Sequence, residues 1–324
     1  MYPFAFTKPA TERDALAAGA DGGRYIAGGT TLVDLMRETV ERPSRVVDIN
    51  ALPYRDIAVS SEELRVGSLV RMSELAAHPD VRSRFPVIAQ SLELGASAQL
   101  RNMASIGGNL MQRPRCPYFR DVHSACNRRS PGAGCDAVDG DNRMQAILGA
   151  TAHCVATHPS DLAVALVALD AVVHLRATTG TRTVPVAEFF LRPGNTPHRE
   201  RALEPGELIT AVHVPAGPHT RRSGYLKVRD RQSYEFALAS AAVALDIEGE
   251  VIRGARVAVG GVATVPWRLP EVERALVGRR PGRETWKEAA SRAADGARAL
   301  SGNAFKIQLL ERTVRRQLTT VGGR

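Results

Sequence analysis

The sequence has almost no lysine and few aromatic residues, although its 324 residues carry a formal net charge of +9. Only four of its 43 basic residues are lysine, and Phe, Trp and Tyr together make up 5% of the chain. Because proteins that bind single-stranded nucleic acid stack the bases on aromatic rings, this composition argues against a nucleic-acid-binding protein. An arginine-rich and alanine-rich composition is typical of codon bias, and the positive charge favours an anionic cofactor or an acidic partner subunit.

Long hydrophobic runs are also missing. The longest, Leu162–Leu169, has eight residues, whereas a membrane-spanning helix needs roughly 20. The N-terminus has no basic segment followed by an apolar one, so we expect neither a signal peptide nor a membrane span on this chain. A length of 324 residues exceeds that of an average domain and predicts two domains, each with its own hydrophobic core.

Cysteine is absent before residue 116 and after residue 154, and the stretch between holds all four: Cys116, Cys126, Cys135 and Cys154. Its many glycines and prolines predict a long irregular loop, and such loops usually have a function. Disulfides usually staple small exported domains that lack a core. Zinc sites favour closely paired cysteines, which are missing here. An iron–sulfur cluster needs four thiolates and tolerates wide spacings.

Arginines in or beside the cysteine segment would offset the negative charge of a cluster. They are Arg113, Arg115, Arg120, Arg128, Arg129 and Arg143. Since buried free cysteines are common, the spacing alone leaves all three chemistries open.

Two glycine pairs and one serine–aspartate pair stand at the starts of expected helices. In RYIAGGTTLVDLMRE a short strand at 25–27 meets a glycine turn, and a helix with a capping-box-like start at Thr31 and Asp34 follows. Such a turn lets the backbone approach an anion. The second pair, in ASIGGNL, is typical of a tight turn. In HPSDLAVALVALD we expect Ser160 as the N-cap of a buried helix, with Asp161 complementing its dipole.

The remaining pattern predicts strands at 171–177 and 208–214, and at 183–190 a strand that enters a helical turn. A change of pattern near 215–222 marks a domain boundary, after which segments 224–229, 239–247 and 255–262 predict an antiparallel sheet. Two helices at about 285–300 and 304–320 end the chain.

The motifs IAGGTTLVD, ASIGGNL, PSDLAVAL and YLKVRD occur in this order, and the chain resembles the FAD-binding subunits of the xanthine dehydrogenase family of molybdenum hydroxylases. The resemblance implies an α+β fold: a two-part FAD-binding domain of the vanillyl-alcohol-oxidase type at 1–217, then a smaller domain of antiparallel sheet and helices at 218–324. The cysteine-bearing insertion at 113–154 is similar to that of periplasmic-type aldehyde oxidoreductase subunits, and also to that of 4-hydroxybenzoyl-CoA reductases.

The resemblance also implies roles for individual residues. It places the FAD pyrophosphate on the first glycine turn and helix: Ile26, Ala27, Gly28, Gly29, Thr30, Thr31, Leu32, Val33 and Asp34. It places three residues near the diphosphate and ribityl chain: Ser105, Gly108 and Asn109. Ser160 and Asp161 would bond the ribityl hydroxyls, which replaces the purely structural interpretation of Asp161. Ile209 would pack beside the flavin ring, and Lys227 would lie near it, where a cation favours the anionic reduced form.

The same resemblance makes the four cysteines the ligands of a [4Fe–4S] cluster. Three neighbouring histidines are expected to be loop residues without a ligand role: His123, His153 and His158. The chain has no C-x4-C-x2-C pattern, so the resemblance assigns [2Fe–2S] clusters and molybdenum to other chains.

The expected function is therefore electron transfer within a heterotrimer. A large partner oxidises an aldehyde at molybdenum, a small partner relays electrons through [2Fe–2S] clusters, and FAD on this chain passes them to an external acceptor such as ferredoxin. An aryl-CoA reductase subunit is the nearer alternative, and a basic nucleic-acid-binding module with structural zinc is the alternative from another class. Export to the periplasm would depend on a partner's twin-arginine signal; without it the complex stays in the cytoplasm.

Overall fold

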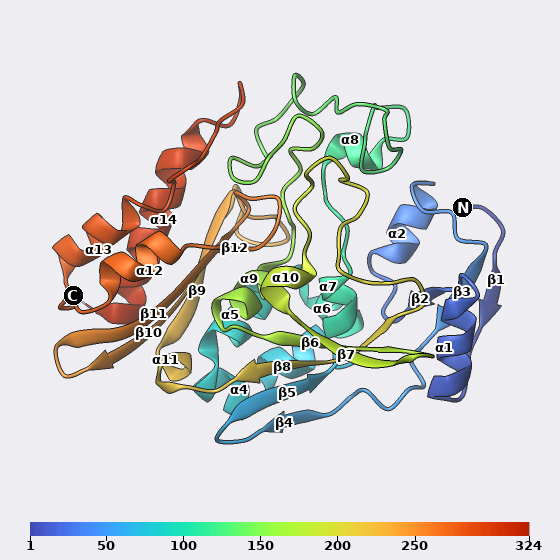
Figure 1. The fold of residues 1–324 in the computed structure, drawn as a ribbon, viewed down its shortest axis with the longest axis horizontal. Coiled ribbons are helices and arrows are strands. Elements are labelled where there is room, and N and C mark those ends of the chain that lie inside the picture. Colours follow the sequence, from blue (N-terminus) through green and yellow to red (C-terminus); the bar gives the residue numbers. More distant parts are fainter. Residues whose placement is uncertain (324) are drawn as a thin grey trace.

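The computed structural model describes residues 1–323, so only the last residue of the expected 218–324 domain lies outside the described part. It contains three sheets in two connected halves, with the cysteine segment running over one edge of the molecule (Figure 1). Within the described residues, every helix is too short or too polar to cross a lipid bilayer. The expected α+β class is confirmed.

A small parallel sheet begins the chain. Its order is β1 (Ala5–Thr7), β3 (Arg45–Asp48) and β2 (Arg24–Ile26). Helix α1 (Glu12–Ala20) precedes β2, and α2 (Leu32–Arg37) follows it after the first glycine pair. The expected strand and helix on either side of this pair are thus confirmed, with Leu35 and Met36 buried as the apolar face of α2.

A five-stranded antiparallel sheet forms the floor of the first half. Its order is β4 (Ile57–Val59), β5 (Glu63–Gly67), β8 (Leu208–Pro215), β6 (Val172–Ala177) and β7 (Gly180–Pro185). The chain leaves this sheet after β5 and returns to it at β6, so the long stretch between these two strands, including the cysteine segment, is an excursion from one sheet.

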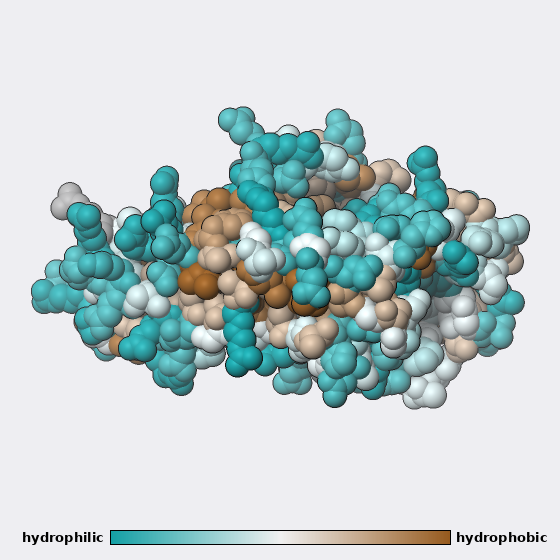
Figure 2. Space-filling model, turned by 90° about the horizontal axis from the view of Figure 1, so that it is seen from above, coloured by the Kyte–Doolittle hydropathy of each residue, from teal (hydrophilic) through white to brown (hydrophobic). Residues whose placement is uncertain are grey.

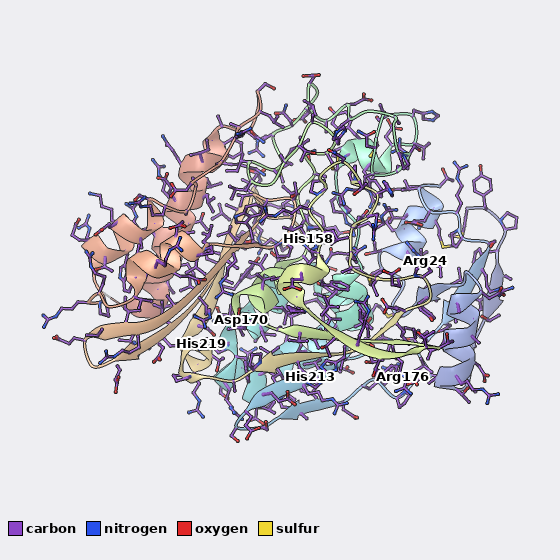
Figure 3. All side chains as sticks on the ribbon, viewed as in Figure 1. Arg24, His158, Asp170, Arg176, His213 and His219 are labelled. Atoms are coloured by element: carbon purple, nitrogen blue, oxygen red, sulfur yellow. The ribbon has the colours of Figure 1, made fainter. Side chains whose placement is uncertain are left out.

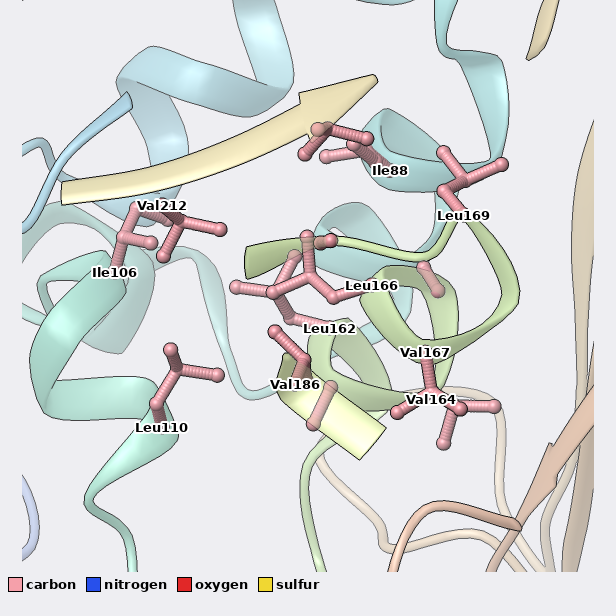
Figure 4. Packing of buried hydrophobic residues seen from close by; sticks show 14 of the residues in the cluster. Ile88, Ile106, Leu110, Leu162, Val164, Leu166, Val167, Leu169, Val186 and Val212 are labelled. Carbon is pink, nitrogen blue, oxygen red and sulfur yellow. The ribbon is translucent and has the colours of Figure 1, made fainter. Parts of the chain in front are cut away.

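Helices fill the space above this sheet. They are α3 (Met72–Ala77), α4 (Pro79–Arg84), α5 (Pro86–Leu94), α6 (Ala98–Met103), α7 (Ile106–Leu110), α9 (Asp161–Ala168) and α10 (Val186–Phe189). All eight residues of α9 are buried, as its continuous apolar sequence predicts. Leu162 and Leu166 lie among Ile106, Val186 and Val212 in the largest hydrophobic core (Figure 4).

The second half is an antiparallel sheet with helices. After α11 (Pro218–Arg221) the strands run in the order β12 (Trp267–Arg268), β11 (Val251–Gly260), β10 (Ala239–Glu248) and β9 (Ser223–Val228). Helices α12 (Pro270–Leu276), α13 (Arg283–Ala290) and α14 (Phe305–Gly322) form a core with the sheet, and α5 and α9 pack against it from the first half. The expected strands at 224–229, 239–247 and 255–262 are confirmed within a few residues.

Three expectations about local structure are wrong. The Thr31 side chain makes no capping bond to α2. The second glycine pair lies inside helix α7, which Ser105 caps, rather than in a turn. Position 107 requires glycine because a Cβ there would lie 2.9 Å from the Ser68 Cβ. The helix expected at about 285–300 is α13, which ends at residue 290. Helix α12 has only seven residues, too few to produce a clear helical pattern in the sequence.

The segment 113–154 is an irregular loop, as expected, and contains only one short helix, α8 (Pro117–Arg120). The C-terminal half fastens it at several points. Lys306 Nζ donates to the carbonyls of Met144, Gln145 and Gly261 at 2.7–3.1 Å. Seen from above, hydrophobic residues gather toward the middle of the molecule, while its two ends are mostly hydrophilic (Figure 2).

Candidate functional site

A groove with a volume of about 520 Å³ opens beside the first glycine pair. Ten of the residues that the sequence assigned to FAD line it: Ile26, Ala27, Gly28, Gly29, Thr30, Thr31, Leu32, Ser105, Gly108 and Ile209. The last two residues assigned on helix α2, Val33 and Asp34, do not line the groove. Val33 points outward with 38% of its surface exposed, and Asp34 is paired with Arg115 and Arg120.

The first glycine pair is required by its surroundings. A Cβ on Gly28 would lie 1.9 Å from the Met103 carbonyl oxygen, so no other residue fits without moving the backbone. Gly29 has a φ of +70°, which favours glycine. Because both positions lack side chains, backbone atoms form the wall of the groove here, and a ligand can approach the main chain directly.

The second glycine loop and the serine–aspartate helix are joined by side chains. Ser105 is buried and accepts a hydrogen bond from the Gly108 amide at 3.1 Å. Ser160 caps α9 by accepting from the Ala163 amide at 3.0 Å, and its hydroxyl also donates to Asn109 Oδ1. The motifs from residues 105–109 and 160–161 therefore form one continuous polar surface.

A second cavity, of about 210 Å³, continues the groove. Thr30, Thr31 and Gly108 line both. Asn109, Asp161 and Lys227, which were also assigned to FAD, line the second cavity but not the groove. Ser160 lines neither of the two and lies in a neighbouring cavity that Asp161 also lines. The shared residues make the two cavities one elongated site, a shape that suits a dinucleotide.

Asp161 and Lys227 form a buried ion pair in the wall of the second cavity. Lys227 Nζ lies 2.7 Å from Asp161 Oδ2, and Tyr225 donates to Asp161 Oδ1 at 2.7 Å. Burial raises the pKa of Asp161, and Lys227 opposes that shift. Burial also raises the pKa of Tyr225. Lys227 thus keeps a fixed position, and its role toward a flavin stays a prediction.

All four cysteines line one small buried cavity between α8 and the strand-like bridge of Cys126 with Cys135. No disulfide joins them. Burial raises the pKa of the Cys116 thiol to about 11 and also raises that of Cys135. Such thiols are poor nucleophiles at neutral pH, so a structural or ligand role suits them better than thiol catalysis.

Backbone amides surround two of these thiols. Within residues 1–323, no group of three His, Cys, Asp or Glu side chains is placed so as to hold a metal ion. Backbone amides of Tyr118 and Phe119 bond Cys116, and those of Ala137 and Val155 bond Cys135.

Two side chains add donors to the sulfurs. Gln145 Nε2 lies 3.5 Å from Cys116 Sγ, and Arg128 Nη2 lies 3.4 Å from Cys154 Sγ. Arg128 Nε is buried without a partner. Since clusters are stabilised by hydrogen bonds to their sulfurs, this donor set fits the expected group.

Of the three histidines near the cysteine segment, His158 has defined contacts with Phe190 and Ser160, and its position is labelled in Figure 3. It packs edge-on against Phe190 with 4.4 Å between ring centroids, and its Nδ1 accepts from the Ser160 amide at 3.3 Å. Burial lowers the pKa of His158 to about 3, so the ring is neutral. It supports the start of α9 and does not line the cysteine cavity, whereas His153 does.

Several residues that line the site lie outside the motifs that the sequence assigned to FAD. Arg113, Met111 and the segment 203–207 line the groove, and Arg115, Tyr234 and Phe236 line the second cavity. Only tertiary folding brings them there. The proximity of Arg113 and Arg115 to the first cysteine was visible in the sequence, but it pointed to the cluster rather than to the groove.

Comparison with known proteins decides the family. The FAD binding domain in molybdopterin dehydrogenase matches residues 2–217. The chain belongs to the FAD-binding subunits of the xanthine dehydrogenase family. This FAD-binding subunit also matches the CO dehydrogenase flavoprotein C-terminal domain over residues 224–321. The family resemblance drawn from the four ordered motifs is therefore confirmed, as is membership of a group of oxidoreductase subunits.

The FAD-binding subunit is 44% identical to the aldehyde oxidoreductase FAD-binding subunit PaoB of Escherichia coli (strain K12), over 97% of this chain and 96% of the relative. It is 27% identical to the glyceraldehyde dehydrogenase medium chain of Sulfolobus acidocaldarius, over 90% and 88%. The solved carbon monoxide dehydrogenase from Hydrogenophaga pseudoflava aligns over 99% of this chain and 98% of its own, with a TM-score of 0.77 and 24% identity, which shows a common fold.

Proposed function

We propose that this chain is the FAD-binding electron-transfer subunit of a molybdenum-dependent aldehyde oxidoreductase and that it also carries a [4Fe–4S] cluster. The 44% identity to a subunit of that name supports the choice of an aldehyde. The observation that carries the cluster assignment is the meeting of all four cysteines, three of them buried and Cys135 partly buried, on one cavity.

In this proposal the groove holds FAD through its backbone walls. The turn at Gly28 and Gly29 admits the diphosphate, and the joined surface of Ser105, Asn109 and Ser160 bonds the chain between diphosphate and ring. Bound FAD supplies conversion between one-electron and two-electron transfer. Asp161 holds Lys227 at the wall of the second cavity, so that its ammonium stays near the ring instead of turning to solvent.

Cys116, Cys126, Cys135 and Cys154 would hold the cluster, which supplies one-electron transfer. Residues of this chain provide what the group needs around it. Backbone amides bond the sulfurs of Cys116 and Cys135, and Arg128 brings a positive charge to Cys154. Cys116, Cys126 and Cys154 are buried, which limits the access of water to their side of the site.

The proposed assembly is a heterotrimer of this chain with a molybdenum-binding large subunit and a [2Fe–2S] small subunit. FAD on this chain passes the electrons to an acceptor such as ferredoxin. The net charge of +9 suits acidic partner surfaces. We place the complex in the periplasm, exported on a partner's twin-arginine signal, with the cytoplasm as the alternative.

The test is a substrate comparison on the assembled complex, purified without oxygen. The proposal predicts that aldehydes reduce its FAD and that aryl-CoA esters do not reoxidise it. The opposite pattern, with electrons flowing to an aryl-CoA ester, would support a 4-hydroxybenzoyl-CoA-reductase-like subunit. Salt-dependent RNA binding by a zinc-containing chain would support the nucleic-acid-binding alternative.

A further inference from the structure

Glu200 is a buried carboxylate among three arginines. Its Oε1 atom accepts a hydrogen bond from Arg113 Nη2 at 2.7 Å and lies 3.5 Å from Arg128 Nη1. Its Oε2 atom lies 3.4 Å from Arg201 Nη1. Only 8% of the Glu200 side chain is exposed. Burial alone would raise the pKa of Glu200, and the three arginines lower it to about 2, so the carboxylate is ionised at neutral pH.

Two of these arginines face different sites. Arg113 lines the dinucleotide groove, and its guanidinium lies 4.5 Å from the centre of the Phe119 ring, next to Cys116. Arg128 lies at the cysteine cavity, with Nη2 3.4 Å from Cys154 Sγ. A single carboxylate oxygen of Glu200 therefore holds one arginine of each site.

The donors of Arg128 exceed the acceptors around it. Its Nε is buried and has no partner within residues 1–323, and its side chain is 6% exposed. Its Nη2 atom faces the Cys154 sulfur, and the low exposure of the side chain keeps the guanidinium from water. A positive charge this close to a cluster ligand stabilises the more negative, reduced state of the cluster, while a nearby carboxylate opposes it.

We propose that Arg128 raises the reduction potential of the [4Fe–4S] cluster through Cys154, and that Glu200, the shared counter-ion of Arg128 and Arg113, offsets part of that effect and lowers the potentials of both cofactors. This inference rests on the proposed cluster. It gives the two cofactor sites a common counter-ion, so that one substitution at Glu200 alters the electrostatics of both.

The test is an anaerobic redox titration of the assembled complex, followed by electron paramagnetic resonance for the cluster and by absorbance for the flavin. Arg128→Gln lowers the equilibrium constant for one-electron reduction of the cluster by about tenfold, which is ~59 mV for a one-electron couple. Glu200→Gln raises the reduction potentials of both the cluster and the flavin, because it removes a negative charge near both sites. Arg143→Gln is the control, since Arg143 pairs with Asp230 at the surface and its side chain is 46% exposed.

Opposite shifts in Arg128→Gln and Glu200→Gln support the proposal, because simple loosening of the loop would move both in one direction. Equal potentials in wild type, Arg128→Gln and Arg143→Gln, at full iron content, would overturn it. If Arg128→Gln loses its iron, Arg128→Lys takes its place: a smaller decrease is expected, and no decrease overturns the inference. Iron-free wild-type protein would refute the proposed function instead.

Discussion

Lys227 and Asp161 face each other across the two halves of the molecule, with 2.7 Å between Nζ and Oδ2. Lys227 comes from β9 of the C-terminal sheet and Asp161 from the first turn of α9. The pair is nearly inaccessible to solvent, and Tyr225 completes it. The wall of the second cavity is thus built from both halves, so the cavity depends on their correct docking.

Asp161→Asn should destabilise the chain by about 3–5 kcal/mol, because it leaves the Lys227 ammonium buried without its partner. Chemical denaturation monitored by circular dichroism measures this. Asp230→Asn breaks the exposed pair with Arg143 and should cost no more than about 1 kcal/mol. Equal effects of the two substitutions would show that the buried pair has no special role in stability.

Gly28→Ala should weaken FAD binding, because the added Cβ collides with the Met103 carbonyl oxygen and shifts the wall of the groove. An overpacking cost of about 1–3 kcal/mol corresponds to roughly 5-fold to 150-fold in affinity. Flavin fluorescence titration of apoprotein gives the dissociation constant. Gly282→Ala, where nothing lies within 4 Å of the added Cβ, should bind FAD as the wild type does.

Cys126→Ser should lose iron and keep FAD, because Cys126 lines the cysteine cavity and no cysteine lines the groove. Metal analysis and the flavin absorbance of the denatured protein measure both contents. His153→Ala is the matched control at the same cavity, and it should retain its iron. Iron loss in the histidine variant but not in the cysteine variant would contradict the ligand assignment.

Glu200 should make stability depend on pH in the acid range. Its folded pKa of about 2 lies below the ordinary value near 4.3. Its contribution is therefore fully present above about pH 4.5 and is lost as the pH falls toward 2, and it amounts to about 3 kcal/mol. Unfolding free energies of wild type and Glu200→Gln between pH 5 and 3 test this. The variant should show the shallower decline, and parallel curves would contradict it.

The sequence contained enough to predict the α+β class and the strands and helices around the motifs. The glycine pair at 28–29, the Ser160 cap and the long strands at 239–248 and 251–260 depend on local chemistry or on strong periodicity. Sequence motifs also named part of the groove, since ten assigned residues line it, mostly around the first glycine pair.

Other features depend on contacts between distant residues. Gly107 lies in helix α7 at a point where a Cβ would be 2.9 Å from the Ser68 Cβ, and no local pattern reports that close approach. Asp161 bonds Lys227 and Tyr225 only after the two halves dock. Glu200 lies in a polar stretch that is typical of solvated residues, whereas the fold buries its side chain against Arg113 and Arg128 of the distant segment 113–154.

The most direct test of the central claim is the cofactor content of the wild-type complex, purified without oxygen. The account predicts one FAD and about four additional iron atoms per chain beyond those of the small subunit, with the spectrum of a reduced [4Fe–4S] cluster. Zinc in place of iron, or an iron-free chain whose cysteines remain free while FAD is fully bound, would contradict it.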